Sequence, residues 1–124
     1  MPITVLVADD EPMIRRALAD MLNEQPGVAV VGVARDRDGA VALARLLRPT
    51  VALLDVRMPG GGAEAARQIG LVSPRTRLVA HSAFDDRPSR TAMQAAGAGA
   101  YIVKGTPAAD IIAQVRAVAG DTRA

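Results

Sequence analysis

Short apolar runs alternate with amphipathic stretches along this chain, and this alternation constrains its fold more than any other feature. Five runs have the length and the largely apolar character of strands buried on both faces of a sheet, and they cover residues 3–8, 28–34, 51–54, 77–82 and 100–103. Between and after them, apolar residues recur at the i, i+3, i+4 and i+7 spacing of one helix face. Five strands that alternate with five helices predict an α/β fold, in which a parallel sheet carries helices on both faces.

A few polar, proline and glycine residues predict where the helices begin and end. Asp38, Ser89 and Thr106 are the expected N-caps of the second, fourth and fifth helices. Pro107 suits the first helical position after Thr106. Gly97 is expected just after the end of the fourth helix, where a positive φ is common.

Length and composition bound the class of protein. The 124 residues fit one domain, which we expect to cover residues 1–120, with 121–124 as a C-terminal tail or the start of a linker to an output domain outside this chain. The chain has no cysteine, which excludes disulfides, thiolate zinc sites and cysteine nucleophiles. It has no apolar run near the roughly 20 residues that cross a bilayer, and its start lacks the basic segment of a signal peptide. We therefore expect a cytoplasmic protein without membrane contact.

The charged residues do not indicate a nucleic-acid surface. The net charge is only +2, and Lys104 is the only lysine among the 15 basic residues. The arginines are scattered along the chain, as expected for solvated faces, and form no basic run. We expect no direct contact between this domain and nucleic acid.

Polar residues follow four of the predicted strands directly. Asp9 and Asp10 come after the first strand, Asp55 after the third, Ser82 at the end of the fourth and Lys104 after the fifth. In open parallel sheets, ligands bind outside the carboxyl ends of the strands, near the point where the strand order reverses. These side chains can therefore converge on one edge of the sheet.

The chemistry of such a cluster points to a cation and to phosphate. Two carboxylates about 4 Å apart repel each other by about 4 kcal/mol at an effective dielectric constant near 20. Lys104 supplies one compensating charge, and a hard divalent ion such as Mg²⁺, which prefers carboxylates, waters and phosphate oxygens, supplies the rest. An Asp side chain beside such an ion can act as a nucleophile and carry an aspartyl-phosphate.

Taken singly, each of these residues has an ordinary interpretation. Asp9 and Asp10 can cap a helix or end a strand in solvent, and Asp55 can belong to a turn. Ser82 can be a strand-end hydroxyl, and Lys104 can be a surface lysine. Their shared position after successive strands favours a common site.

Four segments that hold these residues carry a resemblance. They are Val5–Pro12 (VLVADDEP), Leu53–Gly60 (LLDVRMPG), His81–Phe84 (HSAF) and Ala96–Lys104 (AGAGAYIVK). In this order, and over residues 3–119, the chain resembles the receiver domains of response regulators in bacterial two-component systems. The resemblance implies a flavodoxin-like (βα)5 fold, a three-layer sandwich around a five-stranded parallel sheet of order 2-1-3-4-5.

The resemblance also implies roles for individual residues. Asp55 matches the phosphoacceptor of the family. The implied cofactor is Mg²⁺, or Mn²⁺, held by the carboxylates of Asp9, Asp10 and Asp55 and by the backbone carbonyl of Arg57.

Three further residues match the phosphate-binding and switch positions of the family. Lys104 matches the lysine that pairs with the phosphate, Ser82 the switch hydroxyl and Tyr101 the switch aromatic. Phosphorylation is expected to draw Ser82 onto a phosphate oxygen and to leave a space that Tyr101 fills by rotating inward. The surface of the fourth helix, fifth strand and fifth helix would then change shape.

The implied partners follow from the family. A histidine kinase is the expected phosphodonor, and small acyl phosphates can often substitute for it. An output domain or a protein partner is expected to bind the face of the fourth helix, fifth strand and fifth helix, and a homodimer can form. The segments 57–60 (RMPG) and 83–86 (AFDD) look like those of receivers joined to helix-turn-helix domains, which implies transcription regulation. The domain is expected to catalyse at most its own phosphoryl transfer and autodephosphorylation, so it is not counted as an enzyme.

The chain departs from the family pattern in one loop. Gly61, Gly62 and Ala63 stand where members often carry Met-Asp-Gly, and the extra glycines are expected to loosen the loop without abolishing phosphorylation. Arg57 and Phe84 lie two positions past the acceptor and past the switch hydroxyl, where the family tunes hydrolysis. Their bulk is expected to limit the access of water and to lengthen the life of the phosphate.

Other classes lack their signatures here. A haloacid-dehalogenase-type phosphatase also uses an Asp nucleophile, but the segment 55–59 (DVRMP) lacks its second Asp. Neither a P-loop string nor the dinucleotide glycine fingerprint occurs. The only histidine, His81, has no triad around it and is expected to be an ordinary strand-end histidine, hydrogen-bonded or exposed. The remaining alternative is a pseudo-receiver, a docking module that keeps the fold without turning over phosphate.

Overall fold

The computed structural model describes residues 2–120, in which strands and helices alternate strictly. The strands are β1 (Ile3–Ala8), β2 (Val28–Ala34), β3 (Val51–Asp55), β4 (Arg77–Ser82) and β5 (Ala98–Val103). The helices are α1 (Pro12–Asn23), α2 (Arg37–Leu47), α3 (Gly62–Val72), α4 (Arg87–Ala95) and α5 (Ala108–Val118). The predicted tail or linker at 121–124 lies outside the described residues.

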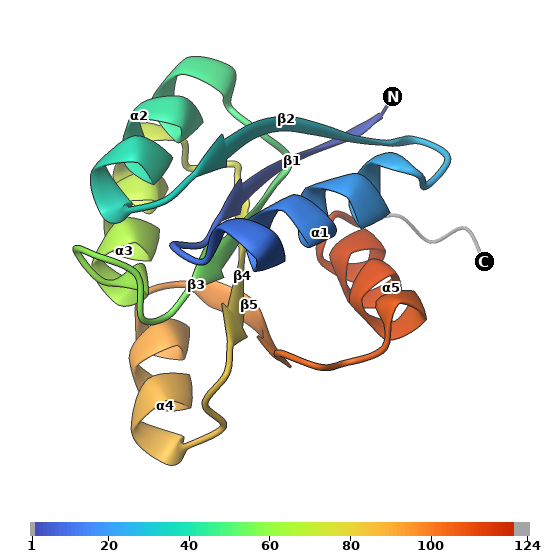
Figure 1. Cartoon of the computed structure of the whole chain (residues 1–124). Helices are drawn as coiled ribbons and strands as arrows, with labels where there is room; N and C mark the ends of the chain where they lie inside the picture. The colour runs from blue at the N-terminus through green and yellow to red at the C-terminus, as the bar shows by residue number, and fades with distance from the viewer. Residues whose placement is uncertain (1, 121–124) are drawn as a thin grey trace.

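All five strands pair in parallel in one sheet of order β2-β1-β3-β4-β5, so the predicted flavodoxin-like topology is confirmed. Helices α1 and α5 cover one face of the sheet, and α2, α3 and α4 cover the other (Figure 1). The chain leaves β1 toward β2 and then returns to place β3 on the other side of β1. This reversal of the strand order opens a crevice at the carboxyl ends of β1 and β3.

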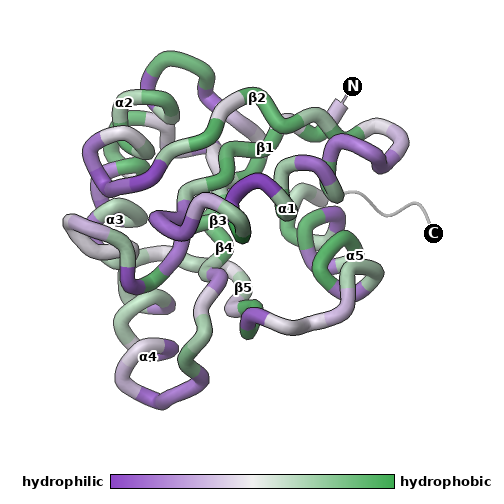
Figure 2. Tube along the Cα trace, viewed as in Figure 1, coloured by the Kyte–Doolittle hydropathy of each residue, from purple (hydrophilic) through white to green (hydrophobic). Residues whose placement is uncertain are grey.

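The core is aliphatic and lies in two clusters, one on each face of the sheet. Strand β3 is buried along its whole length, with Leu53 packed toward α1 and α5 and Leu54 toward the other helices. The apolar colouring of the central strands is plain in Figure 2. Because helices cover both faces, central strands such as β3 show continuous apolar runs where a half-exposed sheet would show an alternation.

Two of the predicted helix N-caps are wrong by two or three residues. The carboxylate of Asp36, and not that of Asp38, accepts the N–H of Gly39 and caps α2, while Asp38 lies in the first turn and pairs with Arg37. Helix α4 is capped by Asp86, and Ser89 is the residue whose N–H and hydroxyl donate to that cap. In both cases the cap is the residue with extended backbone, which the sequence pattern does not show.

The start of α5 and of β5 also differ from the prediction. Pro107 is itself the N-cap of α5, and the hydroxyl of Thr106 donates to the carbonyl of Val103 instead of capping the helix. Strand β5 begins at Ala98, two residues early, because Ala98 still pairs with Leu78 on β4, and Gly99 is the extra residue of a register shift between Leu78 and Val79. Gly97 lies just after α4 with φ of +107°, as predicted.

Candidate functional site

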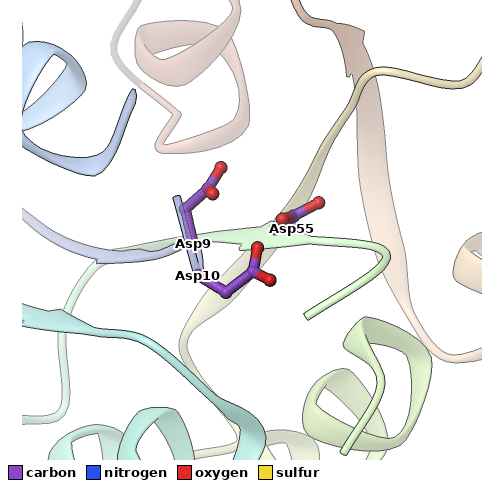
Figure 3. Close-up of side chains that lie close together, drawn as sticks. All are labelled: Asp9, Asp10 and Asp55. Atoms are coloured by element: carbon purple, nitrogen blue, oxygen red, sulfur yellow. The ribbon is translucent and has the colours of Figure 1, made fainter. Parts of the chain in front are cut away.

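The carboxyl ends of four strands meet at one edge of the sheet, and the predicted polar residues meet there. Asp9 follows β1, Asp55 ends β3, Ser82 ends β4 and Lys104 follows β5. Figure 3 shows the carboxylates of Asp9, Asp10 and Asp55 gathered where β1 and β3 end. One oxygen from each of the three lies within 4.8 Å of the others.

The three carboxylates differ in exposure and in how they are held. Asp9 is 1% exposed and Asp55 is 4% exposed, whereas Asp10 lies on the open side of the site. One oxygen of Asp9 accepts the N–H of Glu11 at 2.9 Å, and one oxygen of Asp55 accepts the N–H of Arg57 at 3.3 Å. These bonds fix both side chains from their own loops and leave one oxygen of each to face the crevice.

Burial and a neighbouring charge alter the protonation of Asp55. Burial first, and then the negative charge of Asp9, raise the pKa of Asp55 from its ordinary value of 3.8 to about 6. The N–H of Arg57 and the ammonium of Lys104 act in the opposite direction without cancelling the effect. Asp55 is therefore ionised at neutral pH at a cost in free energy that a bound cation would relieve.

Lys104 is the cation of the site. Its Nζ lies 2.9 Å from Asp9 Oδ2 and 3.4 Å from Asp55 Oδ2. The backbone N–H of Lys104 donates to the carbonyl of Ser82 at 2.7 Å. Burial by itself lowers the pKa of Lys104, but the bond to Asp9 and the charges of both carboxylates outweigh burial and raise it. The ammonium stays charged, which leaves two negative charges in excess among Asp9, Asp10, Asp55 and Lys104 when all four are ionised.

These residues fit a divalent cation with oxygen ligands. Asp9 Oδ2 is fully buried, and within residues 2–120 its close polar neighbour is the Lys104 ammonium at 2.9 Å. A buried carboxylate oxygen, an excess of two negative charges and an open side at Asp10 match the hard, partly hydrated coordination of Mg²⁺ or Mn²⁺.

His81 is buried at the end of β4, and its Nδ1 makes no hydrogen bond within the described residues. It is 4% exposed, and its Nδ1 lies 4.0 Å from Asp9 Oδ2. Burial first, and then the Lys104 ammonium, lower the pKa of His81 to about 4, so the ring is neutral at pH 7. Successive residues of β4 point to opposite faces, which places His81 on the α1 and α5 side and Ser82 on the other side of the sheet.

Phe84 contacts three side chains that are distant from one another in the sequence. Its N–H donates to Ser82 Oγ at 3.0 Å, and its carbonyl accepts the hydroxyl of Tyr101 at 2.6 Å. Its ring packs under the guanidinium of Arg57, 4.0 Å from the centroid. The segment between β4 and α4 thus contacts both predicted switch residues, and no pattern in the sequence indicates this role of the Phe84 backbone.

The two glycines at the start of α3 have unequal roles. A Cβ on Gly62 would lie 2.4 Å from the carbonyl oxygen of Asp55, so the helix can begin there only with glycine. Gly61 has φ of +85° and open space around it. The N–H of Gly61 donates to the carbonyl of Met58, and the N–H of Gly62 donates to the carbonyl of Val56, which ties the loop to the end of β3. The looser loop expected from these glycines stays a prediction.

Comparison with known proteins decides the family. The family model described as the response regulator receiver domain matches residues 5–116. The chain belongs to this family. The receiver fold, the acidic cluster and the lysine at the strand ends therefore describe a signalling domain of two-component systems.

Curated relatives of this receiver domain are bacterial regulators. The response regulator GacA of Pseudomonas viridiflava is 38% identical over 117 residues, which cover 94% of this chain and 55% of the relative. The transcriptional regulatory protein PdtaR of Mycobacterium tuberculosis is 40% identical over 115 residues, which cover 90% of this chain and 54% of the relative. The chain thus spans about half the length of these relatives.

Solved receiver structures agree with the fold along the whole chain. A signal receiver domain of Mycobacterium tuberculosis, assigned to the response regulator NarL, has a TM-score of 0.92 at 32% identity and covers 98% of both chains. The response regulator domain of Thermotoga maritima CheB has a TM-score of 0.88 at 29% identity and covers 97% of this chain and 98% of its own. Within residues 2–120, no helix has the length and hydropathy that a bilayer span requires.

Proposed function

We propose that this receiver domain is a phosphorylation-dependent switch that accepts a phosphoryl group on Asp55 in the presence of Mg²⁺ or Mn²⁺. One observation carries the proposal. The carboxylates of Asp9, Asp10 and Asp55 lie within 4.8 Å of one another, and the Lys104 ammonium contacts two of them. An ordinary acidic surface does not bury two of its carboxylates beside a lysine at the end of a parallel sheet.

In the proposed phosphoryl transfer, Asp55 is the nucleophile and Lys104 contacts the transferred group. The free oxygen of Asp55 attacks phosphorus, an Asp55 O–P bond forms, and the bond from phosphorus to the donor breaks. The donor leaves as the imidazole of a kinase histidine or as the carboxylate of an acyl phosphate, and it takes the bonding electron pair. Lys104 stays within reach of a phosphoryl oxygen, because it already lies 3.4 Å from Asp55 Oδ2.

A divalent ion, when bound, neutralises charge on the transferring phosphoryl oxygens. Asp9 and Asp10, together with Asp55 and the backbone carbonyl of Arg57, are the residues that would hold it. The backbone N–H groups of Glu11 and Arg57 already orient two of these carboxylates, those of Asp9 and Asp55.

The switch residues respond to the new charge, which is about −1.5 to −2 at pH 7. Ser82 is fully buried, and its hydroxyl oxygen accepts the N–H of Phe84. On phosphorylation Ser82 gives up this contact and donates its hydroxyl proton to a phosphoryl oxygen. Tyr101 then rotates inward into the space that Ser82 leaves. The surface of α4, β5 and α5 changes with it, and the partner reads this change as a population shift.

The proposed partners are a histidine kinase as phosphodonor and an output domain or protein partner on the α4, β5 and α5 face, with a homodimer as one form of that contact. The matched relatives include a transcriptional regulatory protein, which supports transcription regulation as the output. Within this proposal residues 1–120 form the receiver, its only catalysis is its own phosphoryl transfer and autodephosphorylation, and residues 121–124 are a tail or the start of a linker. The alternative, a docking pseudo-receiver, keeps the same fold but takes up no phosphate.

Intact-mass measurement separates these alternatives. The protein is incubated with acetyl phosphate and Mg²⁺, beside Asp55→Asn and beside Asp20→Asn, an exposed carboxylate on α1 as matched control. We expect the mass of one phosphoryl group on the wild type and on the control, and none on Asp55→Asn or with EDTA. A wild type that gains no mass from acetyl phosphate or from a histidine kinase would favour the docking module.

A further inference from the structure

Each polar atom of Asp9 has a neighbour that holds it at the end of β1. Its backbone N–H donates to the carbonyl of Ala34 on β2 at 3.0 Å, and its Oδ1 accepts the N–H of Glu11 at 2.9 Å. Its Oδ2 lies 2.9 Å from the Lys104 ammonium. Its backbone carbonyl accepts a hydrogen bond from Nη1 of Arg15 at 2.8 Å. This last contact comes from a side chain that the proposed function does not use.

The start of α1 places Arg15 for this contact. Arg15 lies in the first turns of the helix and follows Asp9 by six positions, so its guanidinium reaches back to the loop that joins β1 to α1. Its side chain is half-buried, whereas Arg16, the next residue, is exposed and makes no hydrogen bond or ion pair within residues 2–120. The two neighbouring arginines therefore differ in whether they contact the loop.

The loop that Arg15 contacts carries three consecutive carboxylates, on Asp9, Asp10 and Glu11. The first two lie close to Asp55 in the acidic cluster (Figure 3). Like charges at this separation repel one another, which favours loop conformations that move them apart. The bond from Arg15 opposes this, because the carbonyl of Asp9 belongs to the peptide group between Asp9 and Asp10. The orientation of that peptide group sets the directions in which both side chains leave the backbone.

We propose that Arg15 is a positioning residue for the divalent metal, and that it keeps the carboxylates of Asp9 and Asp10 together with that of Asp55 by holding the peptide group between the first two. The inference rests on the proposed function, in which these carboxylates hold Mg²⁺ or Mn²⁺. It adds a residue outside the acidic cluster that sets how tightly the ion binds.

The charge of Arg15 and its hydrogen bond act on metal affinity in opposite directions. A guanidinium near a cation site repels the ion, so the loss of this charge alone would tighten metal binding. The loss of the hydrogen bond would weaken it, because the ion must then order a loop that the wild type already holds in place. One hydrogen bond of this kind corresponds to about two- to tenfold in affinity. The direction of the change therefore distinguishes the two effects.

Electron paramagnetic resonance of Mn²⁺ measures the affinity, because free and bound Mn²⁺ give different signals. The main variant is Arg15→Met, which keeps an apolar stem and removes both the donors and the charge. Arg15→Lys keeps the charge and one donor group, and Arg16→Met is the matched control, since it removes the same charge from the neighbouring position. Intact mass follows the rate of phosphorylation by acetyl phosphate over a range of Mn²⁺ concentrations, and urea unfolding verifies the fold.

We expect Arg15→Met to bind Mn²⁺ about two- to tenfold more weakly than the wild type. The Mn²⁺ concentration that gives half the maximal phosphorylation rate should rise by the same factor. The rate at saturating Mn²⁺ should stay close to that of the wild type, because Asp55 and Lys104 are unchanged. Arg15→Lys should recover part of the loss, since it keeps a charged donor with a shorter reach, and Arg16→Met should bind as tightly as the wild type or slightly more tightly.

The outcomes separate the role of Arg15 from the proposed function. A wild type that binds Mn²⁺ and gains phosphoryl mass, beside an Arg15→Met that binds Mn²⁺ equally or more tightly, overturns the role of Arg15 alone, even if the variant is less stable. An equal loss of affinity in Arg16→Met also overturns it, because the bond to the loop would then be irrelevant. If Arg15→Met does not fold, Arg15→Lys compared with Arg16→Lys decides by the same criteria. A wild type that neither binds Mn²⁺ nor gains phosphoryl mass refutes the proposed function, and the role of Arg15 with it.

Discussion

Replacing Asp55 by Asn is expected to stabilise the protein when no divalent metal is present. The carboxylate of Asp55 is buried beside Asp9, and this raises its pKa from 3.8 to about 6. The folded protein therefore binds a proton at Asp55 more tightly than the unfolded chain does. The contribution of this group to stability is full below about pH 3.8 and is lost as the pH rises through about 6.

The size of the effect follows from the same shift. A change in pKa from 3.8 to about 6 corresponds to at most about 3 kcal/mol, at about 1.36 kcal/mol for each pH unit. The open side of the site at Asp10 lets water screen part of this, so we expect Asp55→Asn to be more stable by about 1 kcal/mol at pH 7. Asn keeps the shape of the side chain and removes only the charge.

Urea unfolding in EDTA, followed by circular dichroism between pH 4 and pH 8, measures this difference. The gap between the variant and the wild type should be small at pH 4, widen up to about pH 6 and stay constant above it. Asp20→Asn, an exposed substitution on α1, should follow the wild type at every pH. An Asp55→Asn protein that is no more stable at pH 7, or a gap that does not depend on pH, would refute the reasoning.

Mg²⁺ should reverse the order of stability. At ten times its dissociation constant a ligand of the folded state stabilises a protein by about 1.4 kcal/mol. The wild type should gain this amount, and Asp55→Asn much less, because one of the three clustered carboxylates is gone. Equal gains in both proteins would show that the ion binds elsewhere.

Three further predictions concern the same edge of the sheet. Asp10→Asn should weaken Mg²⁺ binding by about tenfold or more in isothermal titration, since it removes one of the clustered carboxylates, and unchanged affinity would exclude Asp10 as a ligand. Gly62→Ala should lower the free energy of unfolding by about 2 kcal/mol or more, because its Cβ meets the Asp55 carbonyl oxygen at 2.4 Å. Gly70→Ala, in open space on the same helix, should instead be neutral or stabilising by about 0.5–1 kcal/mol, and a similar loss in both would contradict the steric argument. In phosphorylated protein, the double variant Arg57→Ala, Phe84→Ala should lose its phosphate faster than the wild type, because the stacked pair no longer limits the access of water; equal decay rates would rule this out.

Much of the site could be predicted because it depends on position along the strands. Asp9, Asp55 and Lys104 each come at the end of a strand, and parallel strands bring their carboxyl ends to one edge of a sheet. The helix caps were harder to predict, since Asp36 and Asp38 are chemically equivalent and only the backbone conformation selects Asp36. The sequence left the exposure of His81 undecided for a similar reason, because its environment comes from α1 and α5, which are distant in the sequence.

The sequence by itself determined the alternation of strands and helices and the residues that end each strand, because these depend on local periodicity and on the chemistry of neighbouring residues. Only the tertiary structure decided how those residues act on one another. The pKa of Asp55 depends on its burial and on Asp9, which follows another strand, and Tyr101 contacts a carbonyl of the β4–α4 segment and a guanidinium of α4. Such interactions depend on distance and solvent exclusion in three dimensions, and they arise only when the sheet and its covering helices have been assembled.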